Sequence, residues 1–170
     1  MKEKANKETI SHGFGPIFDK ESEVLILGSF PSVKSREDSF YYANKTNRFF
    51  PVLAKIFSEE TPLGTEERKA FLLAHHIALY DVYETVSIVG SSDTSLVGLK
   101  VADLSPIIDS SSIKVVILNG KKALEGYLHN DNRPSLPYLS LPSTSAANAL
   151  YSFLDLVNDY SSILNFLTIK

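Results

Sequence analysis

The segment VLILGSFPS at residues 24–32 decides the fold class of this chain. Its first four residues form a continuous apolar run, which is typical of a strand buried on both faces, as in a parallel sheet. The glycine, proline and serines that follow predict a turn, and Pro31 disfavours a helical conformation at Phe30. A second segment, VVILNG at residues 115–120, has the same pattern of an apolar run that ends in turn residues. The two segments therefore predict a buried, largely parallel sheet.

Other segments predict the elements that complete the fold. Short apolar runs predict two further strands, at residues 77–80 and 138–141. Apolar residues at helical spacing predict helices over residues 47–57, 121–129 and 146–158. Thr65 and Ser105 are each expected to cap a further helix, and Pro106 suits the first helical position after Ser105. Strands that alternate with helices indicate an α/β protein, a three-layer α/β/α sandwich around a central, mostly parallel four-stranded sheet.

Length and composition limit the class of protein. The 170 residues suit one domain, so we expect an N-terminal tail over residues 1–13 and a single domain over residues 14–170. The absence of cysteine excludes a disulfide scaffold, a zinc–thiolate site, an iron–sulfur cluster and a cysteine nucleophile. No run approaches the ~20 apolar residues of a membrane span, and the N-terminus lacks the apolar core of a signal peptide. We therefore expect a soluble, cytoplasmic protein, associated with the nucleoid in a bacterium, that binds no membrane.

Polar residues follow the carboxyl end of each predicted strand. Because ligands of open α/β sheets bind beyond those ends, we expect these residues to meet at one rim. Residues 28–32 offer backbone amides to a ligand, or they form an ordinary turn. The hydroxyls of residues 142–145, at the start of a predicted helix, suit a phosphate, or they only cap that helix. Asp81 and the polar loop at residues 91–93 could join the rim, as could Asn119, or that loop is simply surface.

The segment YYANKTNRFF at residues 41–50 is the least ordinary stretch of the chain. Its four aromatic residues surround two asparagines and two cations. Aromatic faces stack on nucleobases, and amides can read base edges or hold a water molecule. Alternatively, the aromatic residues belong to the core and Asn47 only caps a helix. Elsewhere the histidines lack metal-ligand spacing and the Gly-x-Ser-x-Gly motif of serine hydrolases is absent, so we expect no metal site and no serine nucleophile.

The motifs, taken in their order along the chain, resemble those of a known family. The similarity is to the hypoxanthine-DNA (deoxyinosine) glycosylase branch of the uracil-DNA glycosylase superfamily. It is carried by VLILG, GSFPS, YYANKTNRFF, LYDV with GSSD, VVILNG and LPSTSAANA. It runs from about residue 14 to residue 158. The chain departs from the wider superfamily at Phe30, where an Asp or Asn handles the attacking water, and at Leu141, where a His or Asn precedes Pro-Ser. The resemblance implies the superfamily's α/β/α fold and, without cysteine, a branch that holds no iron–sulfur cluster.

The resemblance also implies an activity and the residues that perform it. The activity is hydrolysis of the N-glycosidic bond of a flipped deoxyinosine in DNA, by a monofunctional glycosylase that leaves an abasic site. Asn47 is then the catalytic residue, which positions the water, and Tyr42 stacks on the base. The other base-binding candidates are Gly28, Ser29, Phe30, Pro31, Asp81 and Asn119. The candidates that bind DNA phosphates are Ser32, Ser35, Ser143, Thr144 and Ser145.

The implied partner is DNA that contains a deaminated base, bound by a monomer without a metal or organic cofactor. One alternative is a uracil or mismatch-specific uracil/thymine DNA glycosylase on the same fold. Another is a non-catalytic α/β nucleic-acid-binding module. The net charge of −3 disfavours DNA on average, but basic residues near the predicted site predict a locally basic rim: Lys34, Arg36, Lys45, Arg48, Lys121 and Lys122. No residue is assigned to fill the space that a flipped base leaves in the duplex.

Overall fold

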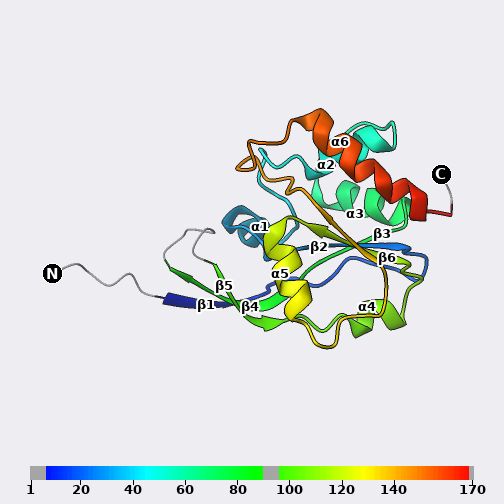
Figure 1. The fold of residues 1–170 in the computed structure, drawn as a ribbon. Coiled ribbons are helices and arrows are strands. Elements are labelled where there is room, and N and C mark those ends of the chain that lie inside the picture. Colours follow the sequence, from blue (N-terminus) through cyan, green and yellow to red (C-terminus); the bar gives the residue numbers. More distant parts are fainter. Residues whose placement is uncertain (1–6, 90–95, 169–170) are drawn as a thin grey trace.

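The central sheet has the four parallel strands that were predicted. The structure is a computed structural model, and it describes residues 7–89 and 96–168. The strand order is β3-β2-β6-β7, and every neighbouring pair is parallel (Figure 1). The strands are β2 (Val24–Gly28), β3 (Ile77–Asp81), β6 (Val115–Asn119) and β7 (Tyr138–Leu141). Every residue of β2 and β6 is buried, which explains their continuous apolar runs.

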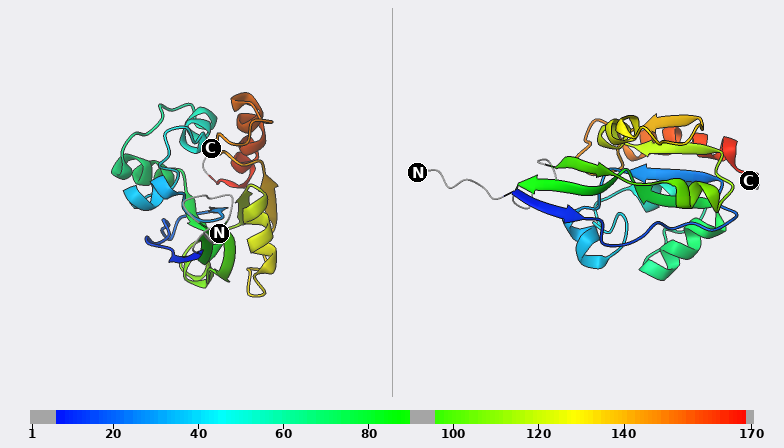
Figure 2. Two further views of the ribbon diagram at one scale, coloured as in Figure 1. Left: turned by 90° about the vertical axis from the view of Figure 1, so that its left-hand side faces the viewer. Right: turned by 90° about the horizontal axis from the view of Figure 1, so that it is seen from below.

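Helices cover both faces of this sheet and complete the three predicted layers (Figures 1 and 2). On one face the core includes side chains from α2 (Phe49–Ile56), α3 (Thr65–Ala74), α6 (Phe153–Tyr160) and the 3-10 helix η2 (Ser161–Phe166). On the other face it includes side chains from α4 (Ser105–Asp109) and α5 (Lys121–His129). Alternate residues of β2 serve the two faces, since Ile26 belongs to the first cluster and Leu27 to the second. The short helix α1 (Val33–Asp38) follows the loop after β2.

A second, antiparallel sheet was not predicted. It consists of β1 (Lys7–Ser11), β4 (Tyr83–Val89) and β5 (Val97–Val101) in the order β1-β4-β5, and it extends from one side of the molecule (Figure 1). The prediction of a tail over residues 1–13 is therefore wrong for residues 7–11, because their backbone pairs with β4 along its whole length. This pairing brings the next residue, His12, to the carboxyl end of the main sheet, where its backbone N–H bonds the Glu84 carbonyl at 2.7 Å.

The predicted helix over residues 146–158 is wrong in its first half. Helix α6 begins only at Phe153, after a reciprocal capping box in which Ser152 and Asp155 bond each other's backbone N–H groups at 3.1 and 2.9 Å. Residues 142–152 form an irregular segment instead. Leu150, which was expected on the apolar stripe of the helix, is 91% exposed.

The predicted helix starts are correct to within a few residues, but two of the caps are wrong. Thr65 and Ser105 are the first residues of α3 and α4, and the cap positions before them belong to Gly64 and Leu104. Helix α2 begins at Phe49, inside the predicted span of 47–57.

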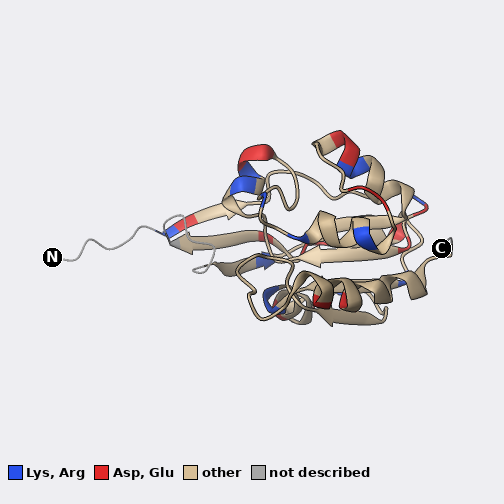
Figure 3. Ribbon diagram, turned by 90° about the horizontal axis from the view of Figure 1, so that it is seen from above, with Lys and Arg blue, Asp and Glu red and all other residues tan. Residues whose placement is uncertain are grey.

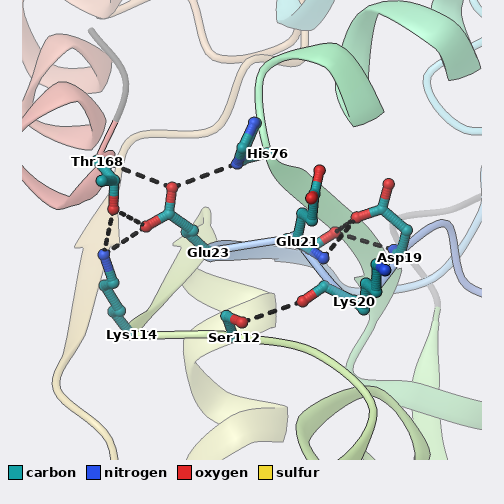
Figure 4. Close-up of polar contacts among 9 residues, drawn as sticks. Asp19, Lys20, Glu21, Glu23, His76, Ser112, Lys114 and Thr168 are labelled. Carbon is teal, nitrogen blue, oxygen red and sulfur yellow. Dashed lines mark hydrogen bonds and ion pairs between the residues drawn. The ribbon is translucent and has the colours of Figure 1, made fainter.

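A buried carboxylate lies at the other end of the sheet, where β2 begins (Figure 4). Glu23 is 5% exposed, and it accepts hydrogen bonds from Lys114 and from the backbone and hydroxyl of Thr168 while His76 Nδ1 lies 3.3 Å from Oε1. Burial alone would raise the pKa of Glu23, but the hydrogen bonds from Lys114 and Thr168 lower it to about 2. The hydrogen bonds of Glu23 connect the start of β2 to Lys114, the residue before β6, and to Thr168, the last described residue of the chain. They therefore stabilise the sheet at the end opposite to the strand ends that carry the candidate site.

Candidate active site

A single cavity collects the residues that the sequence placed at the rim. It has a volume of about 240 Å³, below the ~300–1,000 Å³ of pockets for drug-sized ligands and suited to one nucleobase. All thirteen predicted site residues line it, namely Gly28, Ser29, Phe30, Pro31, Ser32, Ser35, Tyr42, Asn47, Asp81, Asn119, Ser143, Thr144 and Ser145. They come from the carboxyl ends of β2, β3 and β6 and from the loops after β2 and β7. The cavity also includes Tyr41, Asn44, Thr46, Leu96 and Ala146, which were not predicted.

Thr144 links the two asparagines of the cavity. Its hydroxyl donates to Asn47 Oδ1 at 3.0 Å and accepts from Asn119 Nδ2 at 3.1 Å, and its backbone N–H donates to Asn119 Oδ1 at 3.0 Å. Asn119 also donates to the Tyr42 hydroxyl at 3.1 Å. Both amide hydrogens of Asn119 are thus used inside the protein. Asn119 holds Tyr42 and Thr144 in place, and its amide has little capacity left for a base.

Asn47 has its oxygen fixed and its amide nitrogen free. Oδ1 accepts from the Phe49 backbone N–H at 2.9 Å as well as from Thr144. The interpretation of Asn47 as a helix cap is therefore wrong in detail, because the cap position of α2 belongs to Arg48 and Asn47 forms a turn one residue earlier. Asn47 also lines the cavity, and no described residue accepts a hydrogen bond from its Nδ2. The arrangement leaves two N–H bonds available to a water molecule or a substrate.

Tyr42, like Tyr41 before it, reaches both the core and the cavity. Its ring stacks on Phe49 with centroids 4.0 Å apart and planes 20° apart. Burial, reinforced by the nearby charge of Asp81, raises the pKa of Tyr42 far above the ordinary value, so its hydroxyl stays protonated. The backbone of Tyr42 has a φ of 52°, an unfavourable conformation for residues other than glycine. The surrounding contacts stabilise this conformation and fix the ring at the wall of the cavity.

Gly28 lets Asp81 approach the cavity floor. The two residues are paired neighbours in β2 and β3. A Cβ at Gly28 would lie 2.6 Å from Asp81 Oδ1 and 3.0 Å from the Tyr42 hydroxyl. Only glycine leaves room for both groups, so the glycine at the strand end is required by close approach.

His12 is the residue of the site that the sequence analysis missed. Its Nε2 lies 2.9 Å from Asp81 Oδ2, and the two side chains are only 2% and 5% exposed. Aromatic rings surround the imidazole, with centroids 4.8 to 5.9 Å away: Phe14, Phe30, Tyr41 and Tyr80. Burial raises the pKa of Asp81, and the hydrogen bond from His12 opposes that shift. The only signal for His12 was its place next to β1, and that strand itself was not predicted.

The predicted phosphate-binding serines fall into two groups. Ser32 caps α1 by accepting from the Ser35 backbone N–H at 3.2 Å, and the buried hydroxyl of Ser35 accepts from the Ala43 backbone N–H at 3.2 Å. These two serines hold the loop in shape. Ser143 and Ser145 form local turns, in which each hydroxyl accepts from a backbone N–H two residues on, at 3.2 Å. Their O–H groups remain available as donors, although the helix N-terminus that was expected after residues 142–145 is absent.

The basic rim is weaker than predicted. Lys34 pairs with Asp38 at 3.1 Å, while Arg36 and Lys122 donate to backbone carbonyls at 2.8 and 3.2 Å. Basic and acidic residues are interspersed over the elements (Figure 3). Within the described part of the chain, Lys45 and Lys121 are exposed cations without a hydrogen bond or ion pair. They are the members of the rim best able to meet a phosphate.

Arg48 holds the irregular segment that forms one wall of the cavity. Its guanidinium donates to the backbone carbonyls of Tyr151 at 2.5 Å, Ser145 at 2.9 Å and Asn148 at 3.1 Å. Its backbone N–H donates to the Thr144 carbonyl at 3.0 Å. Arg48 is therefore an internal clamp rather than the free cation that the sequence suggested.

Across residues 7–89 and 96–168, no group of three or more His, Asp or Glu side chains could hold a metal ion. No helix within these ranges is long and apolar enough to cross a bilayer. The polar loop at residues 91–93, which was considered together with Asp81, lies outside the described residues.

The fold and the site define a class of protein. A cavity of this size, lined by aromatic rings, amides and a carboxylate at the carboxyl ends of a parallel α/β/α sheet, suits a protein that handles a nucleobase. The family model of the uracil DNA glycosylase superfamily matches residues 16–164, and this chain belongs to that superfamily. The predicted family resemblance and three-layer fold are thereby confirmed, as is the prediction of an enzyme that hydrolyses N-glycosyl bonds.

Individual relatives agree with this assignment. A protein of Methanosarcina acetivorans named Hypoxanthine DNA glycosylase is 31% identical over 147 residues, which cover 84% of this chain and 91% of that protein. A protein of the same name from Methanosarcina barkeri is 32% identical over 115 residues, covering 66% of this chain and 73% of that protein. A solution NMR structure from Methanosarcina acetivorans, provisionally described as a uracil DNA glycosylase, is 26% identical with a TM-score of 0.74 and covers 92% of this chain and 99% of its own.

Proposed function

We propose that this protein hydrolyses the N-glycosidic bond of deoxyinosine in DNA, releasing hypoxanthine and leaving an abasic site. The observation that carries the proposal is the cavity suited to one base, where the free amide of Asn47 faces the same space as Tyr42 and Asp81. The curated relatives named Hypoxanthine DNA glycosylase support hypoxanthine as the base. A base inside a duplex cannot reach such a cavity, so the target nucleotide is extruded, at a cost of a few kcal/mol.

Asn47 positions the attacking water in this mechanism. Because Thr144 and the Phe49 backbone hold its oxygen, the amide nitrogen has a fixed direction and donates to the oxygen of the water. An amide does not take up a proton at neutral pH, so its contribution is to position the water against the anomeric carbon. Negative charge develops on the departing base, and the backbone N–H groups of Ser29 and Phe30, which line the cavity, stabilise it.

Polar groups around the cavity contact the DNA backbone. The hydroxyls of Ser143 and Ser145 and the exposed ammonium of Lys45 are the groups that contact phosphates beside the flipped nucleotide. The proposed form is a monomer, in which one chain supplies the lining residues of the cavity. The substrate lies inside the cell, which is consistent with the proposed cytoplasmic location.

Single-turnover base release tests the proposal. Duplexes that contain one deoxyinosine, or one deoxyuridine, are incubated with the wild-type protein, with Asn47→Ala and with Asn132→Ala, which changes an exposed amide remote from the cavity. We expect hypoxanthine release by the wild type, a loss of roughly 10²-fold or more in Asn47→Ala and no change in Asn132→Ala. Faster release of uracil than of hypoxanthine would favour the uracil-directed alternative. Release of neither base would refute the proposed function.

A further inference from the structure

Asp81 has one carboxylate oxygen engaged and the other available to the cavity. Oδ2 accepts from His12 at 2.9 Å. No described residue donates to Oδ1, which lies beside Gly28 at the cavity wall. The side chain is otherwise buried, with 4% of the residue exposed. The structure thus presents a single, oriented hydrogen-bond acceptor to whatever enters the cavity.

His12 fixes the direction of this acceptor. Its Nδ1 is buried without a hydrogen-bond partner among aromatic rings, so a proton on that nitrogen would have no acceptor. The imidazole therefore carries its proton on Nε2 and donates it to Asp81. A buried carboxylate with an unpartnered oxygen carries an unmet desolvation cost, which a donor on the ligand would remove.

Deamination creates that donor on a nucleobase. Adenine and cytosine carry a lone pair at the ring nitrogen of their pairing edge, at N1 and N3 respectively. Hydrolytic deamination to hypoxanthine or uracil places an N–H at the same nitrogen. A carboxylate oxygen in the cavity attracts hypoxanthine or uracil and repels the lone pair of adenine or cytosine.

We propose that Asp81 Oδ1 accepts the ring N–H of the flipped base and so selects hypoxanthine over adenine and uracil over cytosine, with His12 as the residue that positions it. This inference rests on the proposed glycosylase function and adds how the enzyme distinguishes one flipped base from another. Sites built to hydrogen-bond a substrate N–H or O–H reject analogues that lack it by about 10⁴–10⁵-fold, because a buried polar group is then left unpaired. Selection by Asp81 therefore accounts for refusing the large excess of normal adenine without any change in cavity shape.

The first test compares two purines in the wild type and in Asp81→Asn. One duplex carries deoxyinosine and the other carries the deoxynucleoside of unsubstituted purine, which has a lone pair at N1. The ratio of kcat/KM for the two bases is measured in each protein, so that differences in the lability of the two glycosidic bonds cancel. We expect the wild-type ratio to fall by about 10²-fold or more in Asp81→Asn, whose side chain can turn an N–H toward the base.

The outcomes separate this inference from the function on which it rests. An equal loss for both bases in Asp81→Asn would overturn it, because Asp81 would then act on the sugar or on the fold rather than on the base edge. An unchanged ratio with full activity would overturn it as well. Absence of hypoxanthine release by the wild type would remove the proposed function itself, and this inference with it.

The second test changes His12 and leaves Asp81 in place. His12→Gln keeps a side-chain donor for Oδ2, whereas His12→Phe fills the aromatic surroundings without one. The ionisable groups that face Asp81 are His12, Tyr41, Tyr42 and Tyr80, and His12 alone among them donates to it. Loss of the donor raises the pKa of Asp81, so the acidic limb of the pH–kcat/KM profile moves to higher pH in His12→Phe and moves less in His12→Gln. Profiles of both variants that coincide with the wild type would show that His12 does not position Asp81.

Discussion

Replacing Arg48 by alanine should release one wall of the active site without unfolding the protein. The guanidinium makes three hydrogen bonds, of 2.5, 2.9 and 3.1 Å, to carbonyls of residues 145–151. Hydrogen bonds of charged groups contribute about 1.5–3 kcal/mol each, but the freed carbonyls of an exposed segment regain water, so we expect a loss of about 2–4 kcal/mol in the stability of this wall. That loss corresponds to a population of open segment about 30 to 1,000 times larger.

Hydrogen exchange measures this opening directly. In Arg48→Ala the backbone amides of residues 145–151 should exchange faster by that factor, while those of β2 and β6 stay protected. Hypoxanthine release should fall by about 10²-fold, since Ser143–Thr144 and the Asn47 amide lose their relative positions. Lys45→Ala is the matched control, because it removes an exposed cation of the 41–50 segment, which also contains Arg48. It should lower DNA affinity and make the salt dependence of binding shallower, and it should leave hydrogen exchange unchanged. Unchanged exchange in Arg48→Ala, with a salt dependence that resembles Lys45→Ala, would show that Arg48 contacts phosphate and is not a clamp.

Four further substitutions test the structure. Gly28→Ala places a Cβ 2.6 Å from Asp81 Oδ1, so thermal unfolding should show a loss of about 1–3 kcal/mol together with reduced base release, and wild-type behaviour would contradict the close approach. Glu23→Gln removes a carboxylate whose pKa is about 2 in the folded protein, compared with a reference value of 4.5. This lowered pKa contributes up to ~3 kcal/mol to the free energy of unfolding. The contribution is present above pH 4.5 and is lost as the pH falls toward 2. Urea unfolding should therefore separate wild type and variant at pH 6 and bring them together near pH 2; equal stability at pH 6 would argue against the lowered pKa. Leu150→Ala should change the free energy of unfolding by less than about 0.5 kcal/mol, because the side chain is 91% exposed. Leu156→Ala, at a buried position, should lower it by about 2–5 kcal/mol. The reverse order would favour the helix over residues 146–158 that the sequence predicted.

The main sheet could be predicted because its signals are local. Strands buried on both faces need continuous apolar runs, and such runs stand out in β2 and β6. The antiparallel sheet lacks that signal. Four of the five residues of β1 are exposed, and the strand is held by backbone pairing with β4, more than seventy residues later in the chain. Pairing between distant segments leaves little trace in the composition of either one.

The segment after β7 shows how distant contacts override local periodicity. Apolar residues at helical spacing predicted a helix from Ala146, but the carbonyls of Ser145 and Asn148 accept hydrogen bonds from Arg48, nearly one hundred residues away in sequence. The capping box at Ser152 then starts the helix one loop later. The hydrogen bonds from Arg48 that make the predicted helix wrong also form the wall of the cavity.

For the site, strand ends predicted which residues meet, while hydrogen bonding decides what each can do. Asn119 and Ser35 lie where they were expected, yet their polar atoms already bond other parts of the protein. Phe30 stands where the wider superfamily has an Asp or Asn, and it packs at 5.8 Å from the ring of His12. A carboxylate nevertheless reaches the same cavity, because Asp81 ends the neighbouring strand, glycine at position 28 makes room for it, and His12 arrives from a sheet that the sequence did not predict. The departure at Phe30 therefore does not leave the cavity without a carboxylate: the group comes from β3, and the aromatic residue in the loop helps to bury the histidine that orients it.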